Sequence, residues 1–236
     1  MAKINLERRA EIGQEKRART RAQLVAAACA LFSTRSLASV TVDDLVREAG
    51  VAKGTFYTHF DDMDALAVAV ADDLIASIDE LIQPQRAAAR DPLLRVALGC
   101  NAFIEKALQD PAWGSLVARM ARADPTVGET ARARLREDLK VVLKESPRPG
   151  FSVQLALEAV VGILLQVLAA IGVGRLTHED RAGAVGAILG TLGAGKREAA
   201  STLAKLERAR TTRLLTEGES PSAPAIGVRR GSKASK

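Results

Sequence analysis

The sequence predicts an all-α fold, and composition and hydrophobic spacing carry that prediction. Aromatic residues make up only 3% of the chain, whereas alanine, leucine and valine are abundant, a balance that favours helix. Apolar residues recur at helical spacing, as at Leu24, Ala28, Leu31 and Phe32, and no alternating strand pattern recurs. With 236 residues and a hydrophobic share of 47%, the chain is long enough to bury a substantial core.

These patterns divide the chain into successive parts. Residues 1–15 are polar, and we expect a flexible or weakly helical basic arm there. A compact head of three helices follows over 16–61, and a larger helical body over 62–215. Residues 216–236 are rich in Gly, Ser and Pro, end in basic groups, and are expected to be disordered.

The stretch from Thr41 to Phe60 predicts two short helices joined by a tight turn. Thr41 is placed as the N-cap of the first helix, and Asp44, three residues later, completes a capping box. Gly50 stands where that helix must stop, because a left-handed residue after a helix is nearly free of strain only for glycine. The second helix is expected to begin near Lys53.

The second helix has an apolar side and a polar side. Phe56 and Phe60 are four residues apart and are expected to face inward. The opposite face carries small polar groups, one cation, a phenol and an imidazole, from Lys53, Gly54, Thr55, Tyr57, Thr58 and His59. Such a face fits the major groove of DNA, where donors reach base edges and phosphates. The alternative is a helical hairpin that only packs, with Tyr57 and His59 as ordinary surface residues.

This stretch resembles the DNA-binding domain of the tetracycline-repressor (TetR) family. The resemblance rests on Thr-Val-Asp-Asp-Leu, on Ala-Gly-Val-Ala-Lys-Gly-Thr-Phe-Tyr-Thr-His-Phe and on the following Asp-Ala-Leu, and it covers about residues 17–66. It implies base contacts at the matching positions Lys53, Gly54, Thr55 and Thr58, and phosphate contacts at Thr41, Tyr57 and His59. Ala52 departs from the serine common at the start of the recognition helix, which removes a cap worth about 1 kcal/mol. Met63 replaces a lysine that normally contacts phosphate, so that contact is open.

Charge is unevenly distributed along the chain, although the net charge is +6. Residues 1–22 hold a surplus of basic groups, whereas residues 61–80 hold acidic groups and no basic ones. A polyanion is therefore attracted to the N-terminal end and repelled just past the head. We expect the basic cluster, including Arg17 and Arg19, to lie beside DNA phosphates; solubility alone is the other explanation.

Neither a metal site, a disulfide framework nor a catalytic set is expected. Cys29 and Cys100 are far apart among apolar residues, and His59 and His178 are the only histidines. No Ser/His/Asp set or phosphate-binding loop emerges, so neither an enzyme nor a cofactor is predicted. The charged N-terminus is unlike a secretory signal, and the expected compartment is the cytoplasm.

The body predicts a series of helices. They are expected over 62–83, 91–108, from Asp110, over 124–144, over 151–173, after a Thr177 cap and over 196–215. Pro84 marks a loop in this scheme. The 151–173 segment is apolar enough to invite a transmembrane interpretation, but its Gln and Glu residues favour a buried helix in a bundle, without a membrane partner.

The resemblance further implies a homodimer with a small-molecule cavity in each body. The apolar segment and a later glycine stripe offer the dimer interface, at Val161, Leu165, Gly183, Gly186, Gly190 and Gly193. The candidate cavity residues are Cys100, Phe103, Trp113, Leu116, Met120 and Gln166, with plain core as the alternative for each. The few polar groups in this set imply an apolar or aromatic effector.

We therefore expect a TetR-like transcriptional regulator. It would repress as a homodimer on a palindromic, double-stranded operator and be released by an unidentified small-molecule effector. The alternative is a helical dimer that acts by ligand sequestration or protein contact and has a degraded DNA-binding head. Selection of bound genomic DNA separates these two hypotheses.

Overall fold

The computed structural model describes residues 2–35, 39–146 and 150–218, and these ranges hold helices and no strand. The all-α prediction is confirmed. The elements are α1 (Ala2–Thr34), α2 (Val42–Ala49), α3 (Lys53–Tyr57), α4 (Met63–Ala88), α5 (Pro92–Gln109), α6 (Pro111–Ala123), α7 (Glu129–Glu145), α8 (Val153–Gly172), the short 3₁₀ turn η2 (His178–Asp180), α9 (Arg181–Thr191) and α10 (Lys196–Gly218). Disorder was expected over 216–236, but residues 216–218 continue α10; the rest of that range, residues 219–236, lies outside the described residues.

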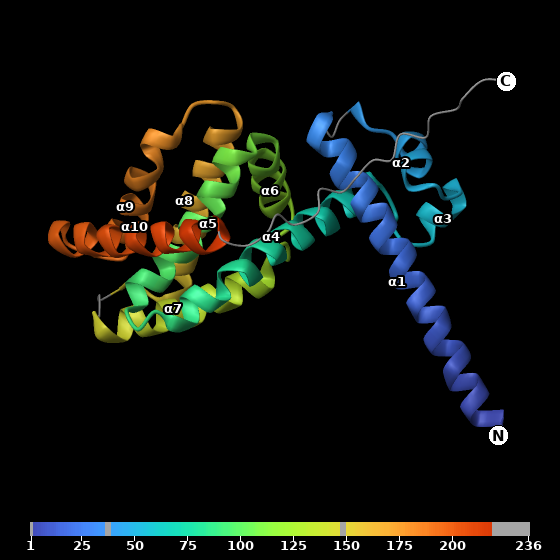
Figure 1. Ribbon diagram of the computed structural model, residues 1–236, viewed down its shortest axis with the longest axis horizontal. Helices are drawn as coiled ribbons and strands as arrows, with labels where there is room; N and C mark the ends of the chain where they lie inside the picture. The colour runs from blue at the N-terminus through green and yellow to red at the C-terminus, as the bar shows by residue number, and fades with distance from the viewer. Residues whose placement is uncertain (1, 36–38, 147–149, 219–236) are drawn as a thin grey trace.

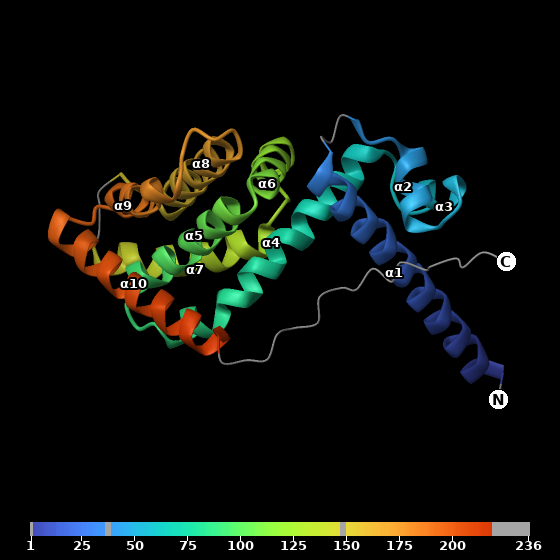
Figure 2. The same cartoon turned by 45° about the horizontal axis from the view of Figure 1, so that its top comes forward.

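The helices form a small head and a larger body joined by α4 (Figures 1 and 2). Short helices α2 and α3 lie beside the C-terminal part of α1 and the start of α4, and α5 to α10 gather around the other end of α4. The N-terminal part of α1 projects away from both.

The core of the head is built from the apolar stripe of α1 and the inner sides of α2 and α3. Leu24, Ala28, Leu45 and Phe56 are completely buried, and Phe32 is nearly so. These residues belong to one hydrophobic cluster that continues through α4 into the body. The head is therefore held to the body by shared apolar burial rather than by a linker.

Helix α1 begins at Ala2, not at Lys16 as the sequence pattern suggested. Residues 2–15 consist largely of Ala, Leu, Glu, Arg, Lys and Gln, which are strong helix formers, and they include no proline. The described side chains from Ile12 to Arg19 are exposed, so no packing partner marked this segment as helical in the hydrophobic pattern. High intrinsic propensity explains the extension.

Helix α4 continues through Pro84 to Ala88, which corrects the expected loop at Pro84. Proline removes one backbone hydrogen bond and crowds the carbonyl four residues earlier, which usually ends a helix. Here the proline is exposed, while Arg86, two residues on, is buried and bonded to Asp79 and Asp138. The buried ion pairs compensate for the defect.

Two other predicted boundaries shift. Helix α7 begins at Glu129 rather than at Asp124, because the Asp124 carboxylate accepts from Thr126 and closes a turn first. Gly193 is not part of the α9 stripe: the helix ends at Thr191, and Gly193 has a φ of 92°, a left-handed conformation that takes the chain out of the helix. The predicted Thr177 cap is confirmed, in a capping box with Asp180.

Helix α8 is the most apolar element, and it packs against α5, α6, α7 and α9. By length and composition alone it could cross a membrane, although a core helix of a soluble protein passes the same test. Leu157, Val160 and Leu168 are completely buried against the neighbouring helices, whereas Leu155 and Gly162 are exposed. One face of α8 lies in the bundle as predicted, and an opposite face remains uncovered by the described chain.

Candidate functional site

The turn between α2 and α3 is fixed by the caps that the sequence predicted. The Thr41 hydroxyl accepts from the backbone N–H of Asp44 at 3.2 Å, and the Asp44 carboxylate accepts from the backbone N–H of Thr41 at 3.2 Å. These bonds, led by the Thr41 hydroxyl, hold the pKa of Asp44 below its ordinary range. Gly50 follows α2 with a φ of 67°, the left-handed conformation expected of it.

Helix α3 is short and is anchored by its aromatic inner side. Phe56 is completely buried, and its ring centroid lies 6.0 Å from that of Phe60. Ala52 occupies the N-cap position with extended backbone angles and makes no side-chain cap bond, as its sequence predicts. Burial of aromatic rings therefore holds α3 in place, without help from a cap.

The outer side of α3 faces solvent. Lys53, Gly54, Tyr57 and Thr58 are exposed, and Thr55 and His59 are half-buried. Tyr57 is 53% exposed although its ring packs edge-on against Phe56. A side chain added at Gly54 would meet nothing within 4 Å, so the backbone there is open to close approach. The residues expected to contact DNA are thus brought together on one surface, and the contacts themselves stay predictions.

Sequence reasoning missed that Lys53, the one cation on the outer side of α3, is already paired. Its Nζ lies 2.9 Å from the Asp43 carboxylate on α2. That bond raises the pKa of Lys53 above its ordinary value. Both side chains are more than half exposed, so the pair is weak in water and its lysine can be exchanged to a stronger anion.

The remaining predicted DNA contacts lie on α1 and at the start of α2. Arg17 and Arg19 are exposed on α1, and the Arg21 guanidinium lies over the Phe60 ring, 5.3 Å from its centroid. Thr41 is exposed, but its hydroxyl also donates to Asp44 at 2.8 Å. A phosphate bound there must share Thr41 with the capping box.

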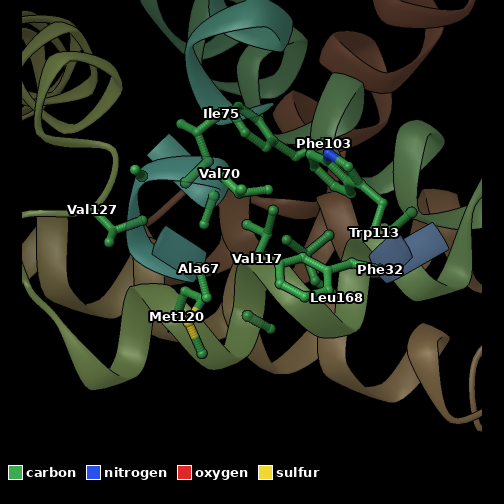
Figure 3. Close-up of a cluster of buried hydrophobic side chains, with 14 of the residues drawn as sticks. Phe32, Ala67, Val70, Ile75, Phe103, Trp113, Val117, Met120, Val127 and Leu168 are labelled. Carbon is green, nitrogen blue, oxygen red and sulfur yellow. The ribbon is translucent and has the colours of Figure 1, made fainter. Parts of the chain in front are cut away.

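A cavity of about 80 Å³ lies in the body between α4, α5, α6, α7 and α8. Its walls are mostly apolar, and they include Ile75, Cys100, Phe103, Val127, Leu164 and Leu168. Figure 3 shows four of these side chains, which come from different parts of the chain: Ile75, Phe103, Val127 and Leu168. A long helix that enters the head, α4, thus also forms one wall of the cavity.

Only part of the predicted cavity set lines this space. Cys100 and Phe103 do, whereas Trp113 and Met120 are buried in the surrounding core and Leu116 is half-buried beside it. Gln166 is exposed and accepts from Arg122 at 2.9 Å. Periodicity identified the buried sides of the helices but could not say which buried residues border empty space.

The structure places the residues predicted for the dimer interface in two groups. Val161 and Leu165 are half-buried and line the cavity. The exposed apolar face of α8 and α9 instead includes Leu155, Gly162 and Val173, together with Gly183 and Gly190. A side chain at Gly162, Gly183 or Gly190 would meet nothing within 4 Å in the described chain.

The cavity has a charged end that sequence reasoning missed. Asp79, Arg86, Arg95 and Arg132 line it, and the Arg86 guanidinium bonds Asp79 at 3.1 Å and Asp138 at 2.5 Å. Asp79 and Arg86 are seven residues apart on the buried side of α4. Two opposite charges within an apolar stripe could have indicated this buried ion pair from the sequence.

The two cysteines are unsuited to catalysis. Burial raises the pKa of Cys100 to about 12, so its thiol stays protonated. Burial also raises the pKa of Cys29. Within the described ranges no group of His, Cys, Asp and Glu is placed to hold a metal ion.

Comparison with known proteins accounts for the head and the layout of the body. Residues 24–70 match the family of bacterial regulatory proteins, tetR family. The crystal structure of RolR in complex with resorcinol is 26% identical over 80% of this chain and 95% of its own, with a TM-score of 0.68. A TetR-family transcriptional regulator from Pectobacterium atrosepticum is 26% identical over 74% of this chain and 93% of its own, with a TM-score of 0.60. With its capped α2, its exposed α3 and its helical body, the chain resembles the tetR family of bacterial regulatory proteins, whose family model its head matches.

Proposed function

We propose that this regulator is a repressor that binds a palindromic operator as a homodimer and leaves it when a small ligand fills the body. The observation that carries the proposal is the exposed polar side of α3, held out by the buried Phe56. Lys53, Gly54, Thr55 and Thr58 would contact base edges, and Tyr57 and His59 phosphates, with Arg17 and Arg19 on the flanking backbone. In bacteria, operator DNA lies in the cytoplasm, which is where the protein would act.

The exposed face of α8 and α9 supports dimerisation. Val173 is 63% exposed and Leu155 49% exposed, although both are large apolar residues of the kind that a soluble protein buries. The exposed glycines at 162, 183 and 190 leave room for helices of a second copy to approach closely. Pairing α8 and α9 of two copies would form a four-helix interface. Two heads would then read two half-sites, which one short helix cannot specify alone.

The cavity supports release by a small ligand. Its walls are largely apolar. Helix α4 contributes Leu66 and Val70 to the head and, further along the helix, Ile75, Asp79 and Arg86 to the cavity wall. A ligand that alters the packing of α4 would therefore change the position of α3 relative to the body. That RolR binds resorcinol, an aromatic compound, supports an effector of similar size here. A coupling of about 1–3 kcal/mol would suffice for release.

The decisive experiment is selection of genomic DNA fragments by the purified full-length protein. We expect enrichment of fragments that share a palindrome, with half-sites about one helical turn apart. Binding should weaken steeply with salt, because phosphate contacts release counterions. Recovery of random fragments only, from protein whose helical content is intact, would contradict the proposal.

A second candidate function is ligand sequestration or protein contact with a degraded DNA-binding head. The pairing of Lys53 with Asp43 favours it, because it occupies the cation on the outer side of α3. The missing cap at Ala52 also favours it, because it leaves α3 less stable. A protein that binds small molecules saturably and selects no DNA sequence would establish this alternative.

A further inference from the structure

The charged end of the cavity holds more positive than negative groups. The cavity wall includes three arginines, Arg86, Arg95 and Arg132, against a single carboxylate, Asp79. Arg132 pairs with Glu158 at 2.8 Å on the outside of the bundle. Arg86 and Arg95 share the Asp138 carboxylate, at 2.5 and 2.9 Å. Apart from Arg132, three guanidinium groups, those of Arg86, Arg95 and Arg134, share two carboxylates, Asp79 and Asp138, so this part of the cluster is one anion short.

Hydrogen-bond donors in this cluster are also left over. Arg86 is 7% exposed, and its Nε has no hydrogen-bond partner among the described residues. The Nε of Arg95 lies 2.9 Å from Asp138, yet it lacks the angle of a hydrogen bond and is likewise unsatisfied in the described part of the chain. A buried donor without an acceptor costs about 1–3 kcal/mol, so an acceptor placed here is strongly favoured.

We propose that the cavity binds a small amphiphile with one aromatic or compact aliphatic body and one carboxylate, the carboxylate bound by Arg86 and Arg95. This inference rests on the proposed function, and it names the class of effector. A carboxylate supplies the missing charge and accepts the free guanidinium donors, while Phe103, Leu164 and Leu168 cover the apolar body.

The size of the cavity limits the body of the ligand. A cavity of about 150 Å³ accepts benzene, whereas this one measures about 80 Å³. A single ring or a short chain therefore fits only when the walls move outward, and fused rings or long chains would require far larger displacement. The ligand is small as well as anionic.

The fluorescence of a tryptophan near the cavity can report ligand binding. Trp113 is the only tryptophan, it is buried, and its ring centroid lies 6.1 Å from that of Phe103 on the cavity wall. Full-length protein would be titrated with matched pairs of probes that differ only in charge: benzoate with benzamide, phenylacetate with phenylacetamide, and hexanoate with hexanamide. Trp113 emission measures binding without DNA.

We expect at least one carboxylate to saturate the emission change at a concentration about tenfold or more below that of its amide. Arg95→Gln, whose side chain is 26% exposed, should lose that preference and keep the affinity for the amide. The matched control is Arg90→Gln, an exposed arginine that does not line the cavity and should behave as the wild type. Circular dichroism verifies that both variants fold.

Equal or tighter binding of the amides to the wild-type protein would overturn the proposal, and so would the absence of saturable carboxylate binding. Operator binding measured in parallel separates this inference from the proposed function. Saturable carboxylate binding by a protein that selects no DNA would support the ligand class and contradict the repressor. Sequence-specific DNA binding together with a preference for neutral probes would leave the repressor intact and overturn the carboxylate.

Discussion

At the scale of single residues, the cation proposed to contact DNA is already paired within the protein. Lys53 is the only cation on the outer side of α3, and Asp43 already binds it at 2.9 Å. Tyr57 is exposed while the neighbouring Phe56 is completely buried. Adjacent residues on one short helix thus have different roles: the buried Phe56 ring fixes the helix, and the Tyr57 ring is accessible to a ligand.

Replacement of Lys53 and replacement of Asp43 should have opposite effects on DNA binding. Lys53→Ala removes the cation and is expected to weaken operator binding by about tenfold, the typical loss for one good contact. Asp43→Asn releases the lysine and removes a negative charge near phosphate, so it should strengthen binding. Anisotropy of a labelled operator measures both effects, with Lys140→Ala, at an exposed position of α7, as the control. Weaker binding by Asp43→Asn would show that the pair positions Lys53 rather than competing for it.

Tyr57 and Phe56 provide a second contrast between neighbours. Tyr57→Ala should reduce operator affinity and leave the melting temperature unchanged, because the ring is 53% exposed. Phe56→Ala empties a completely buried site and should cost about 3–5 kcal/mol of folding free energy. Thermal melts alongside DNA titrations distinguish the two. A large stability loss in Tyr57→Ala would remove its assignment as a DNA contact.

At the scale of elements, short helices are defined by how they begin and end. Helix α2 has a capping box and a left-handed glycine at its end, both legible in the sequence because caps are local. Asp91 and Asp110 cap α5 and α6 by accepting hydrogen bonds from backbone N–H groups of the first turn, and both starts were predicted. Pro84 was misjudged, because the buried bonds of Arg86 involve Asp138, 52 residues away. Local rules cannot detect a compensation that arises from tertiary contact.

A capping side chain added at position 52 should stabilise α3, the helix that we propose contacts DNA bases. Ala52 has the extended backbone of an N-cap, with φ −75° and ψ 149°, but no side-chain oxygen. Ala52→Ser supplies one and should stabilise the head by about 1 kcal/mol. The urea midpoint should rise, and operator affinity should rise with it if fraying of α3 limits binding. An unchanged midpoint would mean that aromatic burial alone determines the order of α3.

The capping box of α2 should make the head sensitive to acid. Thr41 holds the pKa of Asp44 below its ordinary range, so the folded head prefers the ionised carboxylate more than the unfolded chain does. The stabilisation is complete above the ordinary pKa of about 4 and is lost as pH falls through the lower folded value. Asp44→Asn should flatten the pH dependence of stability in that window. A pH profile identical to that of the wild type would exclude this linkage.

At the scale of the whole molecule, an apolar face of α8 and α9 is left uncovered by the described chain, and we propose that a second copy binds there. The sequence predicted a dimer interface on the apolar segment and the glycines, and that prediction included Val161 and Leu165, which line the cavity in this structure. Both faces of α8 are apolar, so hydrophobic spacing could not separate the side that meets its own bundle from the side that meets a partner. The cavity and its charged end were equally hidden, since they depend on how five helices meet.

A charge placed on that face should separate the two subunits. Gly162 is exposed on α8, and a side chain there meets nothing within 4 Å, so Gly162→Glu fits the single chain and improves helix propensity. It should give a monomer in sedimentation and weaken operator binding. Gly13→Glu adds the same charge to exposed α1 and should remain dimeric. A Gly162→Glu protein that stays dimeric would place the interface elsewhere.

Helix α4 belongs to both parts of the protein, with Leu66 and Val70 completely buried in the same cluster as Leu45 and Phe56. A fragment cut after residue 61 would expose to water the apolar side chains that α4 covers, and it should precipitate or unfold. Any chimera that grafts this head onto another body must therefore carry the opening turns of α4 with it. The boundary of the head as a structural unit therefore lies within α4 and not at a loop between helices.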